Sequence, residues 1–242
     1  MPVSPQAQVT VFGNRLLDAM PHDDMARLSP YMRRIFLHRG QELHLADDRL
    51  ELMHFPVDAL LWCWCDSTKT ERATSIVTVG RRGIVGLHHI LDLPRPAVHT
   101  VVLSPGAAWR LSASAFDTVA DSGSGAFRRM ILRYSYANVV VSCARLACNS
   151  EHNVDKRLAR WLLWIMDETG KPEVALTHQQ LADVAAIRRP SVSLAFSDLQ
   201  RRGIVRVHHG LVQILDRERL LRETCACYYT IHDAIESVTA SS

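Results

Sequence analysis

The spacing of hydrophobic residues divides the chain into regions of different structure. Over residues 14–30, and again beyond residue 125, apolar residues recur every three or four positions, which predicts helices. Between residues 31 and 112, short runs rich in β-branched and aromatic residues are separated by glycines, which predicts a sandwich or small barrel. We expect its strands at 35–37, 60–65, 75–79, 98–103 and 108–111.

A long helix is expected from the break at Asp121–Gly125 to about Cys148. Its apolar residues keep a strict 3-4 spacing over three heptads: Phe127, Met130, Tyr134, Ala137, Val141, Ala144 and Cys148. Such a seam packs either against its own domain or against a second copy of the chain. We favour the second copy, because a helix between two domains should have one free face. Asp in place of Val141 is then expected to break the dimer.

A further helix is predicted over 153–168, and residues 176–204 predict two short helices joined by a tight turn. Thr177 and Gln180 form a capping box at the start of the first helix, which runs to about Ala185. Pro190 suits the first turn of the second helix, and Gly203 ends it. The inward face of the second helix consists of Val192, Ala195, Phe196 and Leu199.

Two β-rich runs, 204–207 and 211–214, flank His208-His209-Gly210 and predict a hairpin. A helix pair followed by a hairpin is the layout of a helix-turn-helix with a wing, which binds duplex DNA. Between Arg188 and Arg206 there are five arginines and one aspartate, a net charge of +4 that suits phosphate binding. A plain amphipathic helix pair with a solvated basic face is the alternative interpretation.

The outward residues at the start of the second helix are the candidate DNA contacts. They are Arg188, Arg189, Pro190, Ser191, Ser193 and Leu194. Arg189 is the strongest candidate, because its planar guanidinium can donate to guanine O6 and N7 together.

Composition narrows the possibilities. The 242 residues fit one large or two modest domains, and the net charge of only +3 requires that any affinity for nucleic acid come from a local patch. The longest apolar run, Ala59–Cys65, is far shorter than the roughly 20 residues that span a bilayer. No signal peptide is recognised at the start, so we expect a soluble, cytoplasmic protein without membrane contact.

The cysteines and histidines indicate no catalytic or metal site. The six cysteines, at positions 63, 65, 143, 148, 225 and 227, are expected to be reduced thiols, and the two C-x-C pairs do not match C-x₂-C metal spacing. A jelly-roll metal-dependent enzyme needs an H-x-H pair. His88 and His89 are adjacent and would point to opposite faces of a strand, and His54 and His99 are isolated. A ligand-binding adaptor without DNA binding is a second alternative.

Three segments, 79–86, 153–162 and 176–215, together with the order of elements, resemble the Crp/Fnr family of bacterial transcription regulators. The resemblance implies an α+β chain with three parts. These are an antiparallel jelly-roll, cyclic-nucleotide-binding-like sensor domain (14–122), a long dimerisation helix (123–150) and a winged helix-turn-helix (151–242). It further implies a homodimer on a near-palindromic double-stranded operator, switched by a small effector, with RNA polymerase as a partner.

The resemblance also implies particular site residues. Base contacts fall on Arg189, Pro190, Ser191 and Leu194, and phosphate contacts on Thr177 and His178. The effector pocket matches Gly83, Gly86, Leu87, His99 and Thr100. Leu87 cannot accept a ribose hydroxyl, and His99 is mostly neutral at pH 7 and a weaker anion partner than arginine. We therefore do not expect cyclic AMP, and the cofactor is left unassigned.

Overall fold

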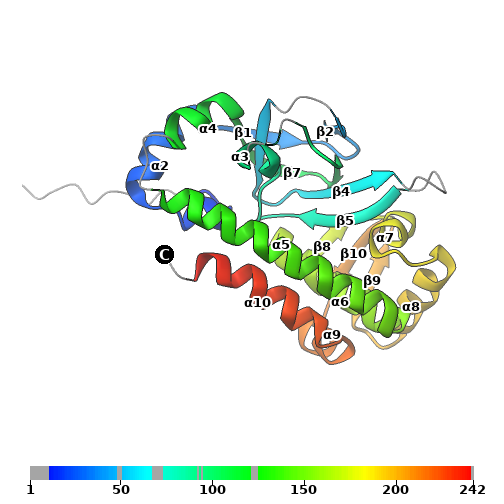
Figure 1. Cartoon of the computed structure of the whole chain (residues 1–242). Coiled ribbons are helices and arrows are strands. Elements are labelled where there is room, and N and C mark those ends of the chain that lie inside the picture. The colour runs from blue at the N-terminus through cyan, green and yellow to red at the C-terminus, as the bar shows by residue number, and fades with distance from the viewer. Residues whose placement is uncertain are drawn as a thin grey trace, which may run out of the picture.

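An antiparallel roll of two sheets forms the first half of the chain (Figure 1). The computed structural model describes residues 11–47, 51–66, 73–91, 93, 95–120 and 125–240. One sheet has the strand order β1 (Arg33–Leu37), β7 (Gly106–Ser112), β3 (Leu52–Pro56), and the other has the order β2 (Glu42–His44), β6 (His99–Ser104), β4 (Leu60–Asp66), β5 (Ala73–Val79). All five strands expected from the sequence are present.

Two strands of the roll that the sequence did not predict, β2 and β3, place histidines inside it. β2 has only three residues, and β3 ends in proline and contains no β-branched residue, so neither has the usual composition of a strand. Pairing with a neighbouring strand, β6 and β7 respectively, holds each of them in place. His44 and His54 are buried with their ring centroids 5.5 Å apart, so the expectation that His54 is isolated is wrong.

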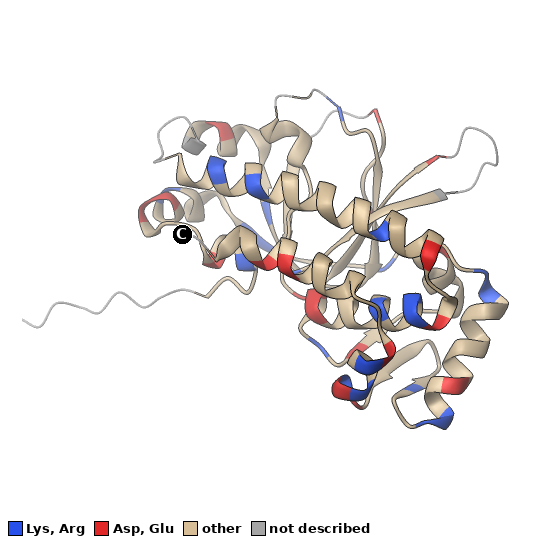
Figure 2. Cartoon of the chain, turned by 60° about the horizontal axis from the view of Figure 1, so that its bottom comes forward, with Lys and Arg blue, Asp and Glu red and all other residues tan. Residues whose placement is uncertain are grey.

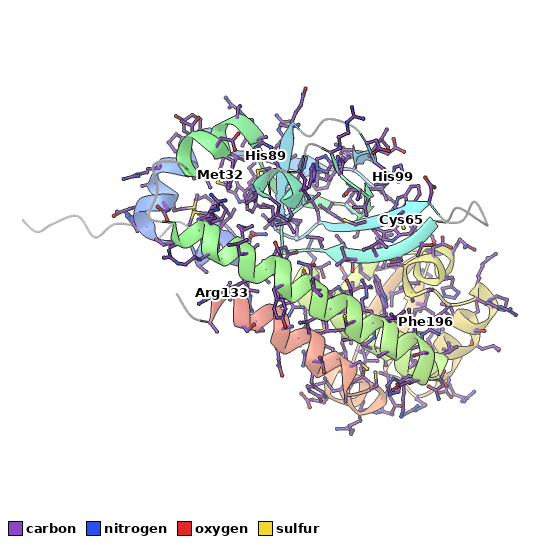
Figure 3. The ribbon with its side chains drawn as sticks, viewed as in Figure 1. Met32, Cys65, His89, His99, Arg133 and Phe196 are labelled. Carbon is purple, nitrogen blue, oxygen red and sulfur yellow. The ribbon has the colours of Figure 1, made fainter. Side chains whose placement is uncertain are left out.

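Short helices close the roll. α1 (Arg15–Asp18), α2 (His22–Leu28) and the 3-10 turn η1 (Ser29–Tyr31) confirm the helical prediction for residues 14–30, and α3 (Leu87–Ile90) and α4 (Ala113–Ala120) are additional. His88 and His89 lie on α3 and not on a strand. The ring of His88 lies 6.5 Å from that of His44, whereas His89, labelled in Figure 3, contacts Asp117 at 2.9 Å.

α5 (Ala126–Glu151) is the longest helix described, and α10 (Cys227–Thr239) lies antiparallel beside it (Figure 1). Of the predicted break before α5, only Gly125 lies within the described residues. None of the described helices is both long and apolar enough to cross a bilayer.

The seam that we expected to join two copies faces inward. Six of its seven residues are at most 8 % exposed, and the seventh, Ala144, is partly buried. Residues of the roll and its helices, such as Leu16 and Phe55, and Ile231 and Ile235 of α10 form a single core with this face of α5. The assignment of Phe127, Met130, Tyr134, Ala137, Val141, Ala144 and Cys148 to a dimer seam is therefore wrong, because the chain itself covers them.

The second half of the chain contains the predicted helix pair and hairpin. Its elements are α6 (Val154–Thr169), β8 (Glu173–Ala175), α7 (His178–Ala185), α8 (Arg189–Arg201), β9 (Val205–His208), β10 (Leu211–Ile214) and α9 (Arg217–Glu223). The strands form a sheet in the order β8-β10-β9, of which the sequence predicts only β10 and β9. Trp161, Phe196 and the aliphatic residues around them are the core of this half.

A buried ionic contact joins the two halves of the chain. The Glu168 carboxylate, at the end of α6, accepts hydrogen bonds from the Gly80 N–H (2.9 Å) and from Arg82 Nε (2.8 Å). The side chains of Arg82 and Glu168 are 3 % and 2 % exposed. A Cβ at Gly80 would lie 2.5 Å from the Glu168 carbonyl oxygen, so this close approach requires glycine. Part of the segment 79–86 thus docks the roll onto α6.

Candidate functional site

Local hydrogen bonds build the helix-turn-helix as the sequence predicted. The Thr177 N–H donates to Gln180 Oε1 (3.0 Å), and the Gln180 N–H donates to Thr177 Oγ1 (3.1 Å), so the capping box is complete. The turn between α7 and α8 contains Ala186 in a left-handed conformation, with φ at +52°. The Ile187 N–H donates to the Ala182 carbonyl (2.9 Å), which fixes the direction in which α8 begins.

The first turn of α8 presents a basic surface to solvent. Arg188, Arg189 and Pro190 are exposed, and Leu194 one turn later is 74 % exposed. The inward stripe of Val192, Ala195, Phe196 and Leu199 is buried as predicted. Among the residues that the structure describes, no acidic side chain pairs with Arg188 or Arg189. Both guanidinium groups are therefore available to phosphates or base edges.

The arginines at the other end of α8 are partly neutralised by acidic side chains. Arg201 and Arg202 both pair with Asp198, and Arg202 also pairs with Glu223 of α9. The charge surplus predicted for the segment is therefore concentrated at the beginning of α8, while its end carries both signs (Figure 2). A recognition helix meets base edges with its N-terminal residues, which is where the unpaired arginines lie.

His178 of α7 and Ser193 of α8 contact each other across the helix pair. His178 Nδ1 lies 3.0 Å from Ser193 Oγ, and its ring stacks on Phe196 (labelled in Figure 3) at a centroid distance of 4.9 Å. Burial, and then the charge of Arg189, lowers the pKa of His178, and its Nε2 is buried without a hydrogen-bond partner. These contacts brace α7 against α8. Because both side chains are still partly exposed, their contact with DNA stays a prediction.

The wing is a tight hairpin. Only His209 and Gly210 separate β9 from β10, and both have positive φ angles, +46° and +76°. This is the backbone pattern of a type I′ turn, in which the twist of the turn matches that of the strands. The wing thus stands beside the helix pair where the sequence placed it.

A cavity of about 300 Å³ in the roll is the candidate effector pocket. Gly86, Leu87 and Thr100 line it, as expected. His99 does not line it, because adjacent residues of β6 point to opposite faces. Instead, the His99 ring stacks on Trp64 at 4.2 Å, and its Nε2 lies 3.3 Å from an Asp66 carboxylate oxygen (His99 in Figure 3).

Gly83 also lies outside the cavity wall. A Cβ at Gly83 would lie 2.1 Å from the Tyr134 hydroxyl, so Gly83 allows α5 to approach the roll. The inclusion of Gly83 and His99 in the pocket is therefore wrong. Aliphatic side chains make up most of the wall.

Residues of β2, α3 and α5 contribute polar groups to the pocket that the sequence did not indicate. They are His44 of β2, His88 of α3, and Tyr134, Asn138 and Ser142 of α5. Burial, and then the neighbouring His88, lowers the pKa of His44 to about 4, so its imidazole is neutral at pH 7. No charged side chain is among the described residues that line the pocket.

Comparisons with known proteins agree with this arrangement. The model of the Crp-like helix-turn-helix domain matches residues 156–223. A search of the curated proteins finds no match. Among solved structures, FixK2 from Bradyrhizobium japonicum aligns at 14% identity with a TM-score of 0.67, covering 81% of this chain and 98% of that chain. The c-di-GMP responsive global regulator CLP from Xanthomonas campestris aligns at 13% identity with a TM-score of 0.61, covering 80% and 99%.

The fold and the matched helix-turn-helix domain together define the class of protein. The chain has the fold of a transcription regulator with a C-terminal helix-turn-helix. The fold is that of the Crp/Fnr regulators, and the resemblance inferred from the sequence is confirmed. The Crp-like helix-turn-helix over residues 156–223 favours a DNA-binding regulator over the jelly-roll metal-dependent enzyme.

Proposed function

We propose that the protein is a sequence-specific transcription regulator that binds a near-palindromic operator as a homodimer. Residues 14–122 would be the sensor, 123–150 the dimerisation helix and 151–242 the DNA-binding domain, acting in the cytoplasm with RNA polymerase as a partner. The observation that carries this proposal is the exposed first turn of α8 on a capped helix-turn-helix, where Arg188 and Arg189 have no acidic partner among the described residues.

The individual contacts follow from the chemistry of that turn. Arg189 would donate to guanine in the major groove, and Arg188 and the first turn of α7 at Thr177 would contact phosphates. Pro190 and Leu194 offer no hydrogen-bonding side chain, and their exposed apolar surfaces suit the methyl group of thymine. Ser191 is half-buried and would contact the backbone or a base edge.

Arg189→Ala is expected to weaken operator binding by roughly 1–3 kcal/mol per half-site and to relax the preference at one base pair. An operator is first selected from random duplexes, and its affinity is then measured by fluorescence anisotropy at several salt concentrations. Arg201→Ala is the matched control, because Arg201 lies at the other end of the same helix and is paired with Asp198. Unchanged selectivity in Arg189→Ala would refute this assignment, and absence of duplex binding by the wild type would favour the adaptor.

The outer face of α5 is the surface on which two copies would meet. Leu132, Tyr136, Val139, Cys143 and Leu146 follow each other at spacings of 4, 3, 4 and 3 residues, and all are exposed. Between Tyr136 and Ser150 the helix has a single charged residue, Arg145, as the colours of the ribbon in Figure 2 indicate. The Arg145 side chain is buried, so the exposed face of this stretch is uncharged. Depletion of charge and enrichment of apolar residues characterise the centre of protein interfaces.

A depression beside the exposed face of α5 is further support for this face as the dimer interface. Residues of α5 and α10 line a depression of about 510 Å³, and Leu132 and Tyr136 form part of its wall. Side chains of a partner helix would fill it. In a twofold arrangement of parallel helices, each residue of the seam meets the same residue of the partner. Cys143 of one copy would then face Cys143 of the other.

The pocket in the roll suits a small, largely apolar effector. A cyclic nucleotide carries a phosphate, and the described wall contains no arginine or lysine to compensate that charge. The neutral imidazoles of His44 and His88, the Thr100 hydroxyl and the Asn138 amide offer hydrogen bonds to an uncharged ligand. Because Tyr134 and Asn138 belong to α5, a ligand there would act directly on the helix that carries the dimer face.

A further inference from the structure

Four potential metal ligands meet where α5 ends and α10 begins. Cys148 lies in the last turn of α5, His152 caps that helix, and Cys225 and Cys227 flank the N-cap of α10. Their four ligand atoms all lie within 4.8 Å of one another. Cys148 and Cys225 are buried, and His152 and Cys227 are partly buried, so the cluster is sheltered at a surface rather than deep in the core.

Two distances between these atoms match those between neighbouring ligands of a tetrahedral metal ion. Zinc binds cysteine sulfur at about 2.3 Å and histidine nitrogen at about 2.0–2.1 Å, so neighbouring ligands of a tetrahedral site lie roughly 3.5–3.8 Å apart. The sulfur atoms of Cys148 and Cys225 are 3.6 Å apart, and Cys227 Sγ lies 3.8 Å from His152 Nδ1. We propose that Cys148, His152, Cys225 and Cys227 bind one Zn²⁺ ion in a closed, four-coordinate site.

The buried arginines around the four ligands favour a metal complex with a net negative charge. Three thiolates, a neutral imidazole and Zn²⁺ carry a net charge of −1. Arg160 of α6 is 2 % exposed and interacts with Cys148, and its Nε is buried without a hydrogen-bond partner. Arg145 of α5 is also buried, and within the described part of the chain neither arginine has an acidic partner. The zinc complex would compensate buried positive charge that no carboxylate compensates.

The ligand set favours zinc over the other uses of these cysteines. A Cys148–Cys225 disulfide would need an oxidant and would leave His152 and Cys227 without a role. Three thiolates and one imidazole are a common ligand set of structural zinc sites. Cys148 and His152 stand at i and i+4, a spacing at which one helix can present two metal ligands, but Cys148 and Cys225 are 77 residues apart, so the sequence alone did not bring the four residues together.

Zinc at this position would fix the junction between the long helix and the helix-turn-helix. The ion would hold the start of α10 against the end of α5, and His152 immediately precedes Asn153, the N-cap of α6. The orientation of the second half of the chain on α5 would then depend on the metal. This consequence for DNA binding rests on the proposed function, whereas metal binding itself does not.

The test is the metal content of the full chain, purified under reducing conditions without chelators. We expect about one zinc per chain by plasma mass spectrometry. After exchange with Co²⁺ we expect sulfur-to-cobalt charge-transfer absorption and the intense visible bands of a tetrahedral site. Cys225→Ser and Cys227→Ser should each lower the zinc content at least about tenfold. Cys143→Ser and Cys65→Ser, which change cysteines outside the cluster, should retain it, and so should His152→Cys, which keeps four metal ligands.

Three results would overturn the proposal. One is folded wild-type protein that contains no zinc and gives no cobalt spectrum. Another is full zinc content in Cys225→Ser and Cys227→Ser. The third is a Cys148–Cys225 disulfide that persists in the reduced preparation and excludes metal. If the serine variants do not fold, the test uses wild-type protein from which a chelator has removed the metal. Added Zn²⁺ should raise the Tm of this protein, and an unchanged Tm would contradict the zinc site. Operator binding is measured separately, so failure of the DNA-binding proposal leaves the metal result intact.

Discussion

Val139→Asp is expected to convert the dimer into a monomer. Val139 is 56 % exposed in the single chain and lies at the centre of the apolar face of α5. In a twofold dimer, two carboxylates would meet across an apolar seam, where an unpaired charge is costly. We expect the dimer dissociation constant to rise by at least about 100-fold, which corresponds to about 2.8 kcal/mol. Sedimentation equilibrium measures this change directly.

The same variant should lose tight operator binding while each monomer stays folded. A dimer holds its second DNA-binding domain near the second half-site, and this raises affinity by roughly 10²–10⁴-fold over one domain alone. Phe36→Asp, which adds the same charge to an exposed apolar residue of the roll, should leave both mass and affinity unchanged. An unchanged mass for Val139→Asp would refute the proposed face. Mild oxidation offers a second test, because Cys143 should form a disulfide between the two copies.

Val141, on the buried face of α5, shows why a test of the dimer must change a residue on the exposed face. It is 1 % exposed and belongs to the core that α5 forms with the roll and α10. Asp at this position would bury a charge inside one chain, so it should reduce the stability of the monomer itself. Loss of the dimer in Val141→Asp would therefore not identify the interface, whereas loss of the dimer in a folded Val139→Asp would.

Arg82→Met is expected to destabilise the chain by about 3–5 kcal/mol, because it leaves the buried Glu168 carboxylate without its cation. In the native protein burial lowers the pKa of Arg82, but Glu168 and Asp167 outweigh this effect and raise it, so the guanidinium stays charged. Arg82 also lies 4.8 Å from the centre of the Trp164 ring. Urea unfolding followed by tryptophan fluorescence gives the free energy of unfolding.

Arg15→Met is the control that tests whether burial accounts for the strength of the Arg82 contact. Arg15 Nη1 lies 2.8 Å from a Glu236 carboxylate oxygen, the same distance as in the Arg82–Glu168 pair, but the Arg15 side chain is 49 % exposed. Exposed ion pairs typically contribute less than about 1 kcal/mol, so Arg15→Met should have a small effect. If the two variants lost equal stability, burial would not be the reason for the strength of the Arg82 contact.

The effector pocket was only partly predictable. Gly86, Leu87 and Thr100 line the cavity, as the family resemblance implied. His44 and His88 contribute from β2 and α3, elements too short for a sequence pattern to predict. Whether His99 or Thr100 faces the cavity depends on the register of β6, and a shift by one residue exchanges the two faces of a strand.

The sequence by itself determined the helix-turn-helix and its wing. The capping box at Thr177, the turn at Ala186 and the hairpin turn at Gly210 depend on residues only a few positions apart, so local chemistry decides them. Only the tertiary structure decided which face of α5 is free. Two lines of residues on that helix, one through Val141 and one through Val139, share the same 3-4 spacing, and distant segments of the chain cover only the first. The cluster of Cys148, His152, Cys225 and Cys227 has the same origin, because its halves meet only when α10 folds back along α5.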